Sequence, residues 1–170
     1  MIRRRDLLVL GGLGAGVSVL LGRLLFQARP SALCQDKLEC QERQAQQDLP
    51  KSSDPIWPVL KQCHVTLDRA SGTYHLDPTP AVEALAGKSM RVTGYVVPLD
   101  GSDQTKDFLI GVNTPVCFYH PPGDPNEVIA VDAATSIEWS DRLVTVEGVF
   151  TLIRNAQAGV FFKLTDAREV

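Results

Sequence analysis

The sequence lacks the short motifs that identify several large classes of enzyme. It contains no Gly-rich phosphate-binding loop, no Gly-x-Ser-x-Gly nucleophile elbow and no His-Glu-x-x-His zinc helix. It also contains no low-complexity repeat. These absences argue against nucleotide-binding, α/β-hydrolase and zinc-protease chemistry, and no other catalytic constellation is evident in the chain.

Basic residues are scarce after the N-terminal segment. Residues 1–29 contain five basic residues and one acidic residue, whereas the chain from Pro30 onward contains 12 basic and 19 acidic residues, a formal charge of −7. Domains that bind nucleic acid carry a basic surface, so no nucleic-acid partner is expected, nor direct adhesion to anionic lipid. The acidic balance suits a soluble, monomeric domain or one that binds cations.

The N-terminus has the order of an export signal. Arg4 and Arg5, one spacer and two leucines form a twin-arginine pattern, and an uncharged apolar run of 15 residues follows from Leu7 to Leu21. A spanning helix needs roughly 20 apolar residues, and no good cleavage site follows, so a cleaved signal and an uncleaved anchor both stay open. Residues 1–28 therefore predict a twin-arginine-type signal or membrane anchor, against the alternative of a cytoplasmic helix. The domain is expected on the periplasmic side of the bacterial inner membrane.

Residues 29–54 predict a polar linker. Gln, Glu, Lys and Asp dominate this stretch, and the part from Cys34 to Asp48 lacks Gly and Pro, which favours a helix. The helix has no wide apolar stripe. We therefore interpret it as a tether rather than as part of a core.

Residues 55–170 predict one mainly β domain. Short helices are expected after Asp54 and after Thr79, with a β-hairpin between them. Alternating apolar residues and one continuous apolar run predict five strands, over residues 90–96, 108–112, 128–131, 144–152 and 160–164. A Val-x-Gly centre in two strands, at Gly94 and Gly148, indicates bulges or sharp bends. This pattern favours a small OB-like five-stranded barrel with short flanking helices, and a two-sheet sandwich is the alternative.

The most distinctive segment is the proline-rich loop from Thr114 to Glu127. It presents Cys117 and His120 at Cys-x2-His spacing, which lets two ligands from one tight turn reach the same ion, and Cys with neutral His usually binds zinc. Further ligands are needed, and the candidates are Cys63 and His64, followed by His75, Asp124 and Glu127. The alternatives are a buried free cysteine beside a surface histidine, or a Cys63–Cys117 disulfide.

Four cysteines, Cys34, Cys40, Cys63 and Cys117, allow three disulfide pairings in an oxidising compartment. Their number does not choose between disulfides and a metal site. Cys117 with His120 as its base is also a candidate nucleophile. That chemistry needs a third, orienting group, and none is evident in the sequence.

Several segments of the domain resemble one known family. They are Leu-x-Gly-Lys at residues 85–88, Gly-aromatic-x-x-Pro-Leu at 94–99, Phe-Leu-Ile at 108–110, Cys117, the proline pair at 121–122 and Pro-Asn-Glu at 125–127. On these segments the chain resembles the bacterial domain-of-unknown-function family 3299. The resemblance covers residues 55–170.

The resemblance implies a periplasmic or lipid-anchored OB-like domain that often accompanies transporter permeases. Some members of that family carry Cys-x-His in the loop, and relatives carry Cys-x2-Cys. Cys117 matches the shared cysteine and His120 matches the second cysteine of the Cys-x2-Cys form, whereas Tyr119 occupies the Cys-x-His position. Exchange of Cys for His at constant spacing suits a metal ligand, and a disulfide would not tolerate it.

Together these features predict an exported or membrane-tethered periplasmic binding or accessory module. Its expected partners are the membrane, through the N-terminal segment, and an inner-membrane protein of a transporter or envelope complex. Zinc is the candidate cofactor, with four candidate ligands: Cys117, His120, Cys63 and His64. A thiol-dependent enzyme using Cys117 and a purely structural subunit of a membrane complex are the alternatives.

Overall fold

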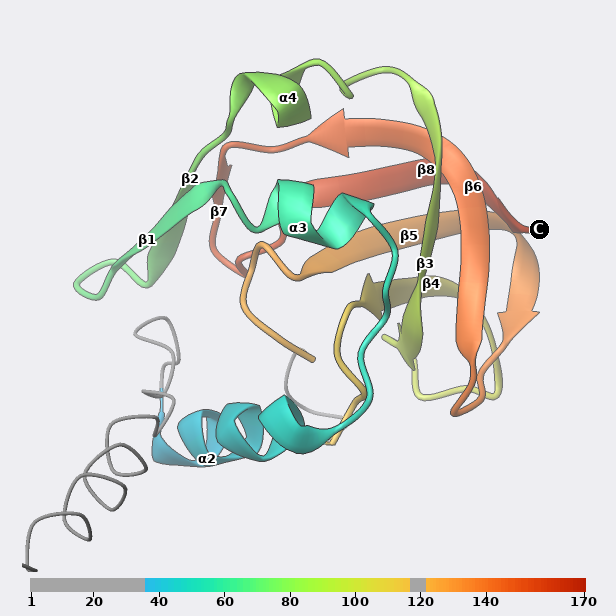
Figure 1. The fold of residues 1–170 in the computed structure, drawn as a ribbon, viewed down its shortest axis with the longest axis horizontal. Coiled ribbons are helices and arrows are strands. Elements are labelled where there is room, and N and C mark those ends of the chain that lie inside the picture. The colour runs from blue at the N-terminus through green and yellow to red at the C-terminus, as the bar shows by residue number, and fades with distance from the viewer. Residues whose placement is uncertain (1–35, 117–121) are drawn as a thin grey trace, which may run out of the picture.

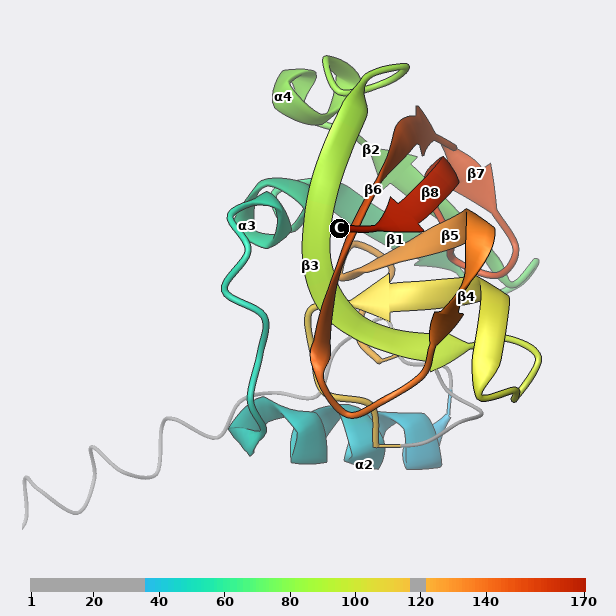
Figure 2. The same cartoon turned by 90° about the vertical axis from the view of Figure 1, so that its right-hand side faces the viewer.

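The structure, a computed structural model, describes residues 36–116 and 122–170 (Figures 1 and 2). The predicted leader, residues 1–28, lies outside the described residues. In the part of the chain that is described, no helix combines the length and the apolar character that crossing a bilayer requires.

Five strands close into a barrel: β3 (Ser89–Pro98), β4 (Gln104–Gly111), β5 (Val128–Glu138), β6 (Leu143–Leu152) and β8 (Phe162–Glu169). Their order around the barrel is β3-β4-β5-β8-β6, and β6 pairs back with β3. All neighbours are antiparallel except β5 and β8, which are parallel. The last strand thus lies between the third and the fourth, as in OB-type Greek-key barrels. The predicted barrel is confirmed, and the alternative of a two-sheet sandwich is wrong.

A small second sheet and two short helices flank one end of the barrel. The sheet has the order β1-β2-β7, with its strands at His64–Asp68, Thr73–Asp77 and Asn155–Ala156. The helices are α3 (Ile56–Leu60) and α4 (Pro80–Glu83). Helix α4 begins after Thr79 as predicted, and the Thr79 side chain caps it by accepting from the Val82 N–H at 3.4 Å.

One hydrophobic core joins the barrel to these flanking elements. Phe108, Phe150 and Phe162 are fully buried inside the barrel, and the rings of Phe150 and Phe162 stack with centroids 5.8 Å apart. Trp57 and Leu60 of α3 belong to the same cluster of buried residues. The indole of Trp57 donates to the backbone oxygen of Thr93 at 2.9 Å, which fixes α3 against β3.

The two strand glycines have different roles. Gly148 lies where the register of β6 against β8 shifts between Glu147 and Val149, so the predicted bulge is confirmed there. Gly94 lies in a regular part of β3 instead, where a Cβ atom would come within 2.6 Å of the Gly111 carbonyl oxygen. This close approach between β3 and β4 requires a residue without a side chain.

Helix α2 (Lys37–Ala45), continued by a 3₁₀ turn at Gln46–Asp48, confirms the helix expected between Cys34 and Asp48. Asp36 caps it by accepting from the Glu39 N–H at 2.8 Å. In both views α2 lies below the barrel, at the opposite end of the molecule from α4 (Figures 1 and 2). The sequence predicts only a polar tether here, but this helix packs against the domain.

Candidate binding site beneath helix α2

The face of α2 that turns toward the domain is polar. Glu39, Arg43 and Gln46 are 6%, 8% and 4% exposed, although all three are polar or charged. Their spacing of four and three residues places them on one side of the helix. A scan for apolar stripes overlooks this face because its buried residues are hydrophilic.

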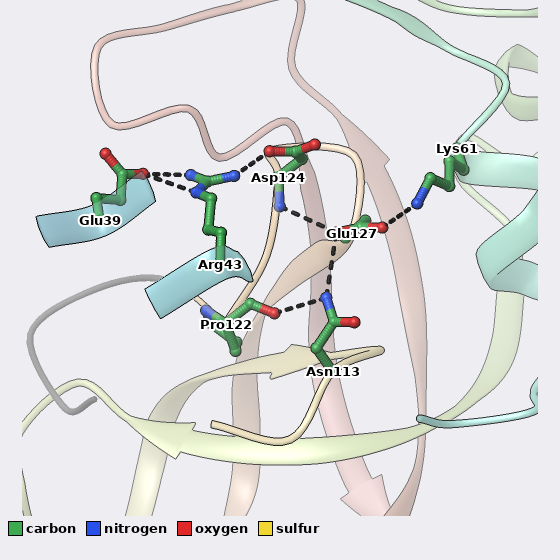
Figure 3. Close-up of polar contacts among 7 residues, drawn as sticks. All are labelled: Glu39, Arg43, Lys61, Asn113, Pro122, Asp124 and Glu127. Atoms are coloured by element: carbon green, nitrogen blue, oxygen red, sulfur yellow. Dashed lines mark hydrogen bonds and ion pairs between the residues drawn. The ribbon is translucent and has the colours of Figure 1, made fainter. Parts of the chain in front are cut away.

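Arg43 attaches the helix to the loop that follows β4. Its guanidinium lies between two carboxylates, those of Glu39 one turn earlier and of Asp124 in the loop (Figure 3). Gln46 adds a hydrogen bond from its Nε2 to the Thr114 carbonyl oxygen at 3.3 Å. The helix is therefore attached on both sides of the segment 117–121, which lies outside the described residues.

Glu127 is the centre of a second group of polar contacts in the same loop. One of its oxygens accepts from the Lys61 ammonium, and the other accepts from Asn113 Nδ2 and the Asp124 N–H, both at 3.1 Å (Figure 3). Burial alone raises the pKa of this carboxyl. The Lys61 ammonium and the two N–H donors outweigh burial, so the net pKa is lowered from its ordinary value of 4.5.

This lowered pKa predicts an acid-dependent loss of stability. A carboxyl whose pKa is lower in the folded state contributes stability that is present above pH 4.5 and lost as the pH falls through the folded-state value. Glu127→Gln cannot titrate, so its unfolding free energy is expected to fall less below pH 4.5. At pH 7 it is expected to be about 1–3 kcal/mol less stable, because it loses charged hydrogen bonds.

Urea unfolding between pH 7 and pH 3 measures both effects. Glu147→Gln is the matched control, since the pKa of Glu147 is also lowered, by Arg91, but this carboxyl lies at the partly exposed surface of β6, where solvent screens it. An unchanged acid dependence in Glu127→Gln would contradict the role assigned to this carboxylate.

A polar cavity of about 330 Å³ lies between α2 and the loop. Arg43, Lys51 and Lys61 line it with Asp124, Glu127 and neutral amides. Gly123 also lines it, and a Cβ atom there would come within 2.7 Å of Asn113 Nδ2 and 2.8 Å of a Glu127 oxygen. The loop thus depends on a glycine to place these groups together.

The predicted metal ligands are only partly within the described residues. Cys117 and His120 lie outside them. Cys63 is a free cysteine, 3% exposed, in the hydrophobic core, whereas His64 is exposed at the start of β1. His75 is also exposed, with its Nδ1 3.0 Å from Asn155 Oδ1.

Asp124 and Glu127, the remaining candidate ligands, do come together, but around Arg43 and Lys61 rather than around other ligands. Among residues 36–116 and 122–170, no group of three or more His, Cys, Asp or Glu side chains could hold a metal ion. The zinc site stays a prediction, since its two principal residues are outside these ranges.

The structure describes two of the four cysteines, Cys40 and Cys63. Cys40 of α2 is disulfide-bonded, and Cys63 is free. The predicted alternative of a Cys63–Cys117 disulfide is therefore wrong. The other two cysteines, Cys34 and Cys117, lie outside the described residues.

A family model described as "Protein of unknown function (DUF3299)" matches residues 33–161. The chain belongs to the DUF3299 family. A solved structure of a DUF3299 family protein from Pseudomonas aeruginosa is 21% identical and covers 56% of this chain and 67% of that chain, with a TM-score of 0.43. No curated protein matches the chain.

In this DUF3299 chain, the family match begins before α2 and so includes the site beneath it. In other OB barrels the outer face of the second and third barrel strands, here β4 and β5, binds oligonucleotides or oligosaccharides. Leu109 of β4 and Val128 of β5 are buried outside the main core, next to a cavity of about 280 Å³ that Glu39 and Arg43 also line. Helix α2 thus lies beside the usual OB ligand face.

Proposed function

We propose that this DUF3299 protein is an extracytoplasmic binding module, held at the periplasmic side of the bacterial inner membrane by its N-terminal segment and serving a transporter or another envelope complex. The polar cavity beneath α2 is its binding site. The charged groups buried around that cavity are the observation that carries this proposal.

Burying charged side chains stabilises the attachment of a helix only weakly, because desolvation opposes the attraction between them. Desolvation of Arg43 and Glu39 offsets much of their attraction, and apolar residues of similar size would pack α2 at least as stably. A concave site lined by ionised groups, one of them a carboxyl with a lowered pKa, is typical of a functional site.

The lining of the cavity favours binding over catalysis. No Ser, Thr, Cys or His belongs to the described residues that line it, so these supply no nucleophile with an adjacent base. Glu127 is also a poor general base, because donors occupy both of its oxygens. The excess of acidic residues argues against nucleic acid.

The disulfide of Cys40 supports the extracytoplasmic location. Stable disulfides persist in oxidising compartments such as the periplasm and are rare in the cytosol. The twin-arginine pattern at Arg4 and Arg5 points to the same side of the membrane.

Zinc binding through Cys117 and His120 is a second proposal, and it requires that Cys117 is not part of a disulfide. A cysteine that ligates zinc must be a thiolate, so Cys117 cannot also pair with Cys40. Peptide mapping by mass spectrometry decides the matter: a Cys34–Cys40 peptide leaves Cys117 for zinc or for thiol chemistry. A Cys40–Cys117 peptide would rule out both roles in the oxidised protein.

The export of the full chain tests the location. In spheroplasts, an added protease is expected to digest the wild-type domain, while the double variant Arg4→Lys with Arg5→Lys stays protected because it is not exported. Arg3→Lys, which leaves the pair intact, is the control and is expected to behave as wild type. A wild-type domain that is protected in spheroplasts would overturn the proposal.

A further inference from the structure

Two cavities of different character meet beneath α2. The polar cavity of about 330 Å³ shares Lys51, Lys61, Asn113 and Glu127 with a second cavity of about 240 Å³. The second cavity extends away from α2, toward apolar groups of α3 and of the segment after β4, namely Trp57, Pro58 and Val112. The shared residues therefore lie between a polar space and an apolar one.

At this junction the carboxylate oxygens have hydrogen-bond partners among the described residues, whereas several N–H donor groups have none. Both oxygens of Glu127 have donors. The two N–H groups of Asn113 Nδ2 donate to Glu127 and to the Pro122 carbonyl oxygen, the latter at 2.9 Å. The carboxylate at the junction thus already accepts three hydrogen bonds from the protein.

Donors, in contrast, are left over. An ammonium has three N–H groups. Lys61 uses one on Glu127, and its side chain is 61% exposed. The side chain of Lys51 is exposed and makes no hydrogen bond or ion pair with any residue in the described ranges. Two cations against one occupied carboxylate leave a positive site that lacks an acceptor.

We propose that the two cavities form one site for a small organic anion. Its anionic group lies between the ammonium groups of Lys51 and Lys61, and its apolar part lies along Trp57 and Val112. This inference rests on the proposed binding function and names the ligand class of the same site. Together the two cavities have the size and the mixed lining that small-molecule sites have.

Phenyl phosphate is a suitable probe, and its binding to the full chain purified in detergent can be followed by NMR. It is expected to shift the signals of residues around Lys51 and Trp57. Benzylammonium, with a similar ring and the opposite charge, is expected to cause no such shifts. Inorganic phosphate is expected to bind more weakly than phenyl phosphate, because it has no apolar part.

Matched variants locate the site. Lys51→Gln and Lys61→Gln are each expected to weaken phenyl phosphate binding about tenfold, since each removes a charged hydrogen-bond donor. Lys106→Gln, at an exposed position of β4 outside both cavities, is expected to bind as wild type. The Lys51 side chain has no partner in the described ranges, so its replacement leaves the fold intact, and thermal unfolding checks this.

Equal binding of benzylammonium, no binding of phenyl phosphate, or unchanged affinity in Lys51→Gln would each overturn the inference. These results leave the spheroplast result untouched. A chain that is exported but does not bind the anion loses only this inference, and a chain that binds the anion but is not exported loses the proposed location.

Discussion

Arg43→Met is expected to release α2 from the domain while the barrel stays folded. The substitution removes the Arg43 guanidinium, which pairs with the buried Glu39 carboxylate of the same helix, and it also breaks the ion pair with Asp124. Removing one partner of a buried ion pair destabilises the structure that holds it by about 3–5 kcal/mol. Since the hydrophobic core does not include α2, this cost is expected to appear as opening of the helix rather than as global unfolding.

Limited proteolysis with an enzyme that cleaves after glutamate measures this opening at Glu39 and Glu42. A cost of about 3 kcal/mol corresponds to cleavage about a hundredfold faster than in wild type. Arg91→Met is the control, because Arg91 pairs with Glu147 at the surface with its side chain 70% exposed. The assay is run with and without a reductant, because Cys40 is disulfide-bonded. Equal cleavage of Arg43→Met and Arg91→Met would contradict the role of Arg43.

Gly94→Ala is expected to destabilise the barrel itself. The new Cβ would lie 2.6 Å from the Gly111 carbonyl oxygen and 2.8 Å from Ile110 Cγ1. The first contact is with backbone, so β3 and β4 must separate where they pair. Overpacking of this kind costs about 3 kcal/mol or more, and thermal unfolding is expected to begin roughly 10 °C earlier.

Gly101→Ala separates this clash from the general cost of losing a glycine. Gly101 has a φ of +68° and open space around its Cα, so alanine there suffers only backbone strain of about 1–2 kcal/mol. If Gly94→Ala lowers the melting temperature no more than Gly101→Ala does, β3 and β4 do not approach as closely as described.

The sequence predicts the barrel well because its strands alternate. In β3, Val92 and Val96 point into the core of the barrel, whereas Arg91 and Thr93 do not. This period of two is visible without a structure. The length of β5 is harder to predict. Its continuous apolar run ends at Val131, but the strand continues to Glu138, where only Ala133 and Ile137 face inward.

The candidate site is largely invisible in the sequence because its members are polar and far apart. Asp124 and Glu127 are recognisable as possible ligands, but nothing local shows that Lys61 and Arg43 neutralise them. The one local signal is the spacing of Glu39, Arg43 and Gln46 along a single face of a helix. That face becomes meaningful only once the loop after β4 is seen to lie against it.

The polar cavity is a site only if α2 belongs to the folded unit that closes it. Hydrogen exchange of the wild-type chain, followed by mass spectrometry, tests this directly for the peptides that cover residues 37–48. We expect amide protection there that is lower than in β3 or β8 but well above that of an unfolded segment, and that is lost in Arg43→Met. Complete exchange of these residues at the first time point in the wild type would show that the helix is a free tether and that the cavity beneath it is not a site.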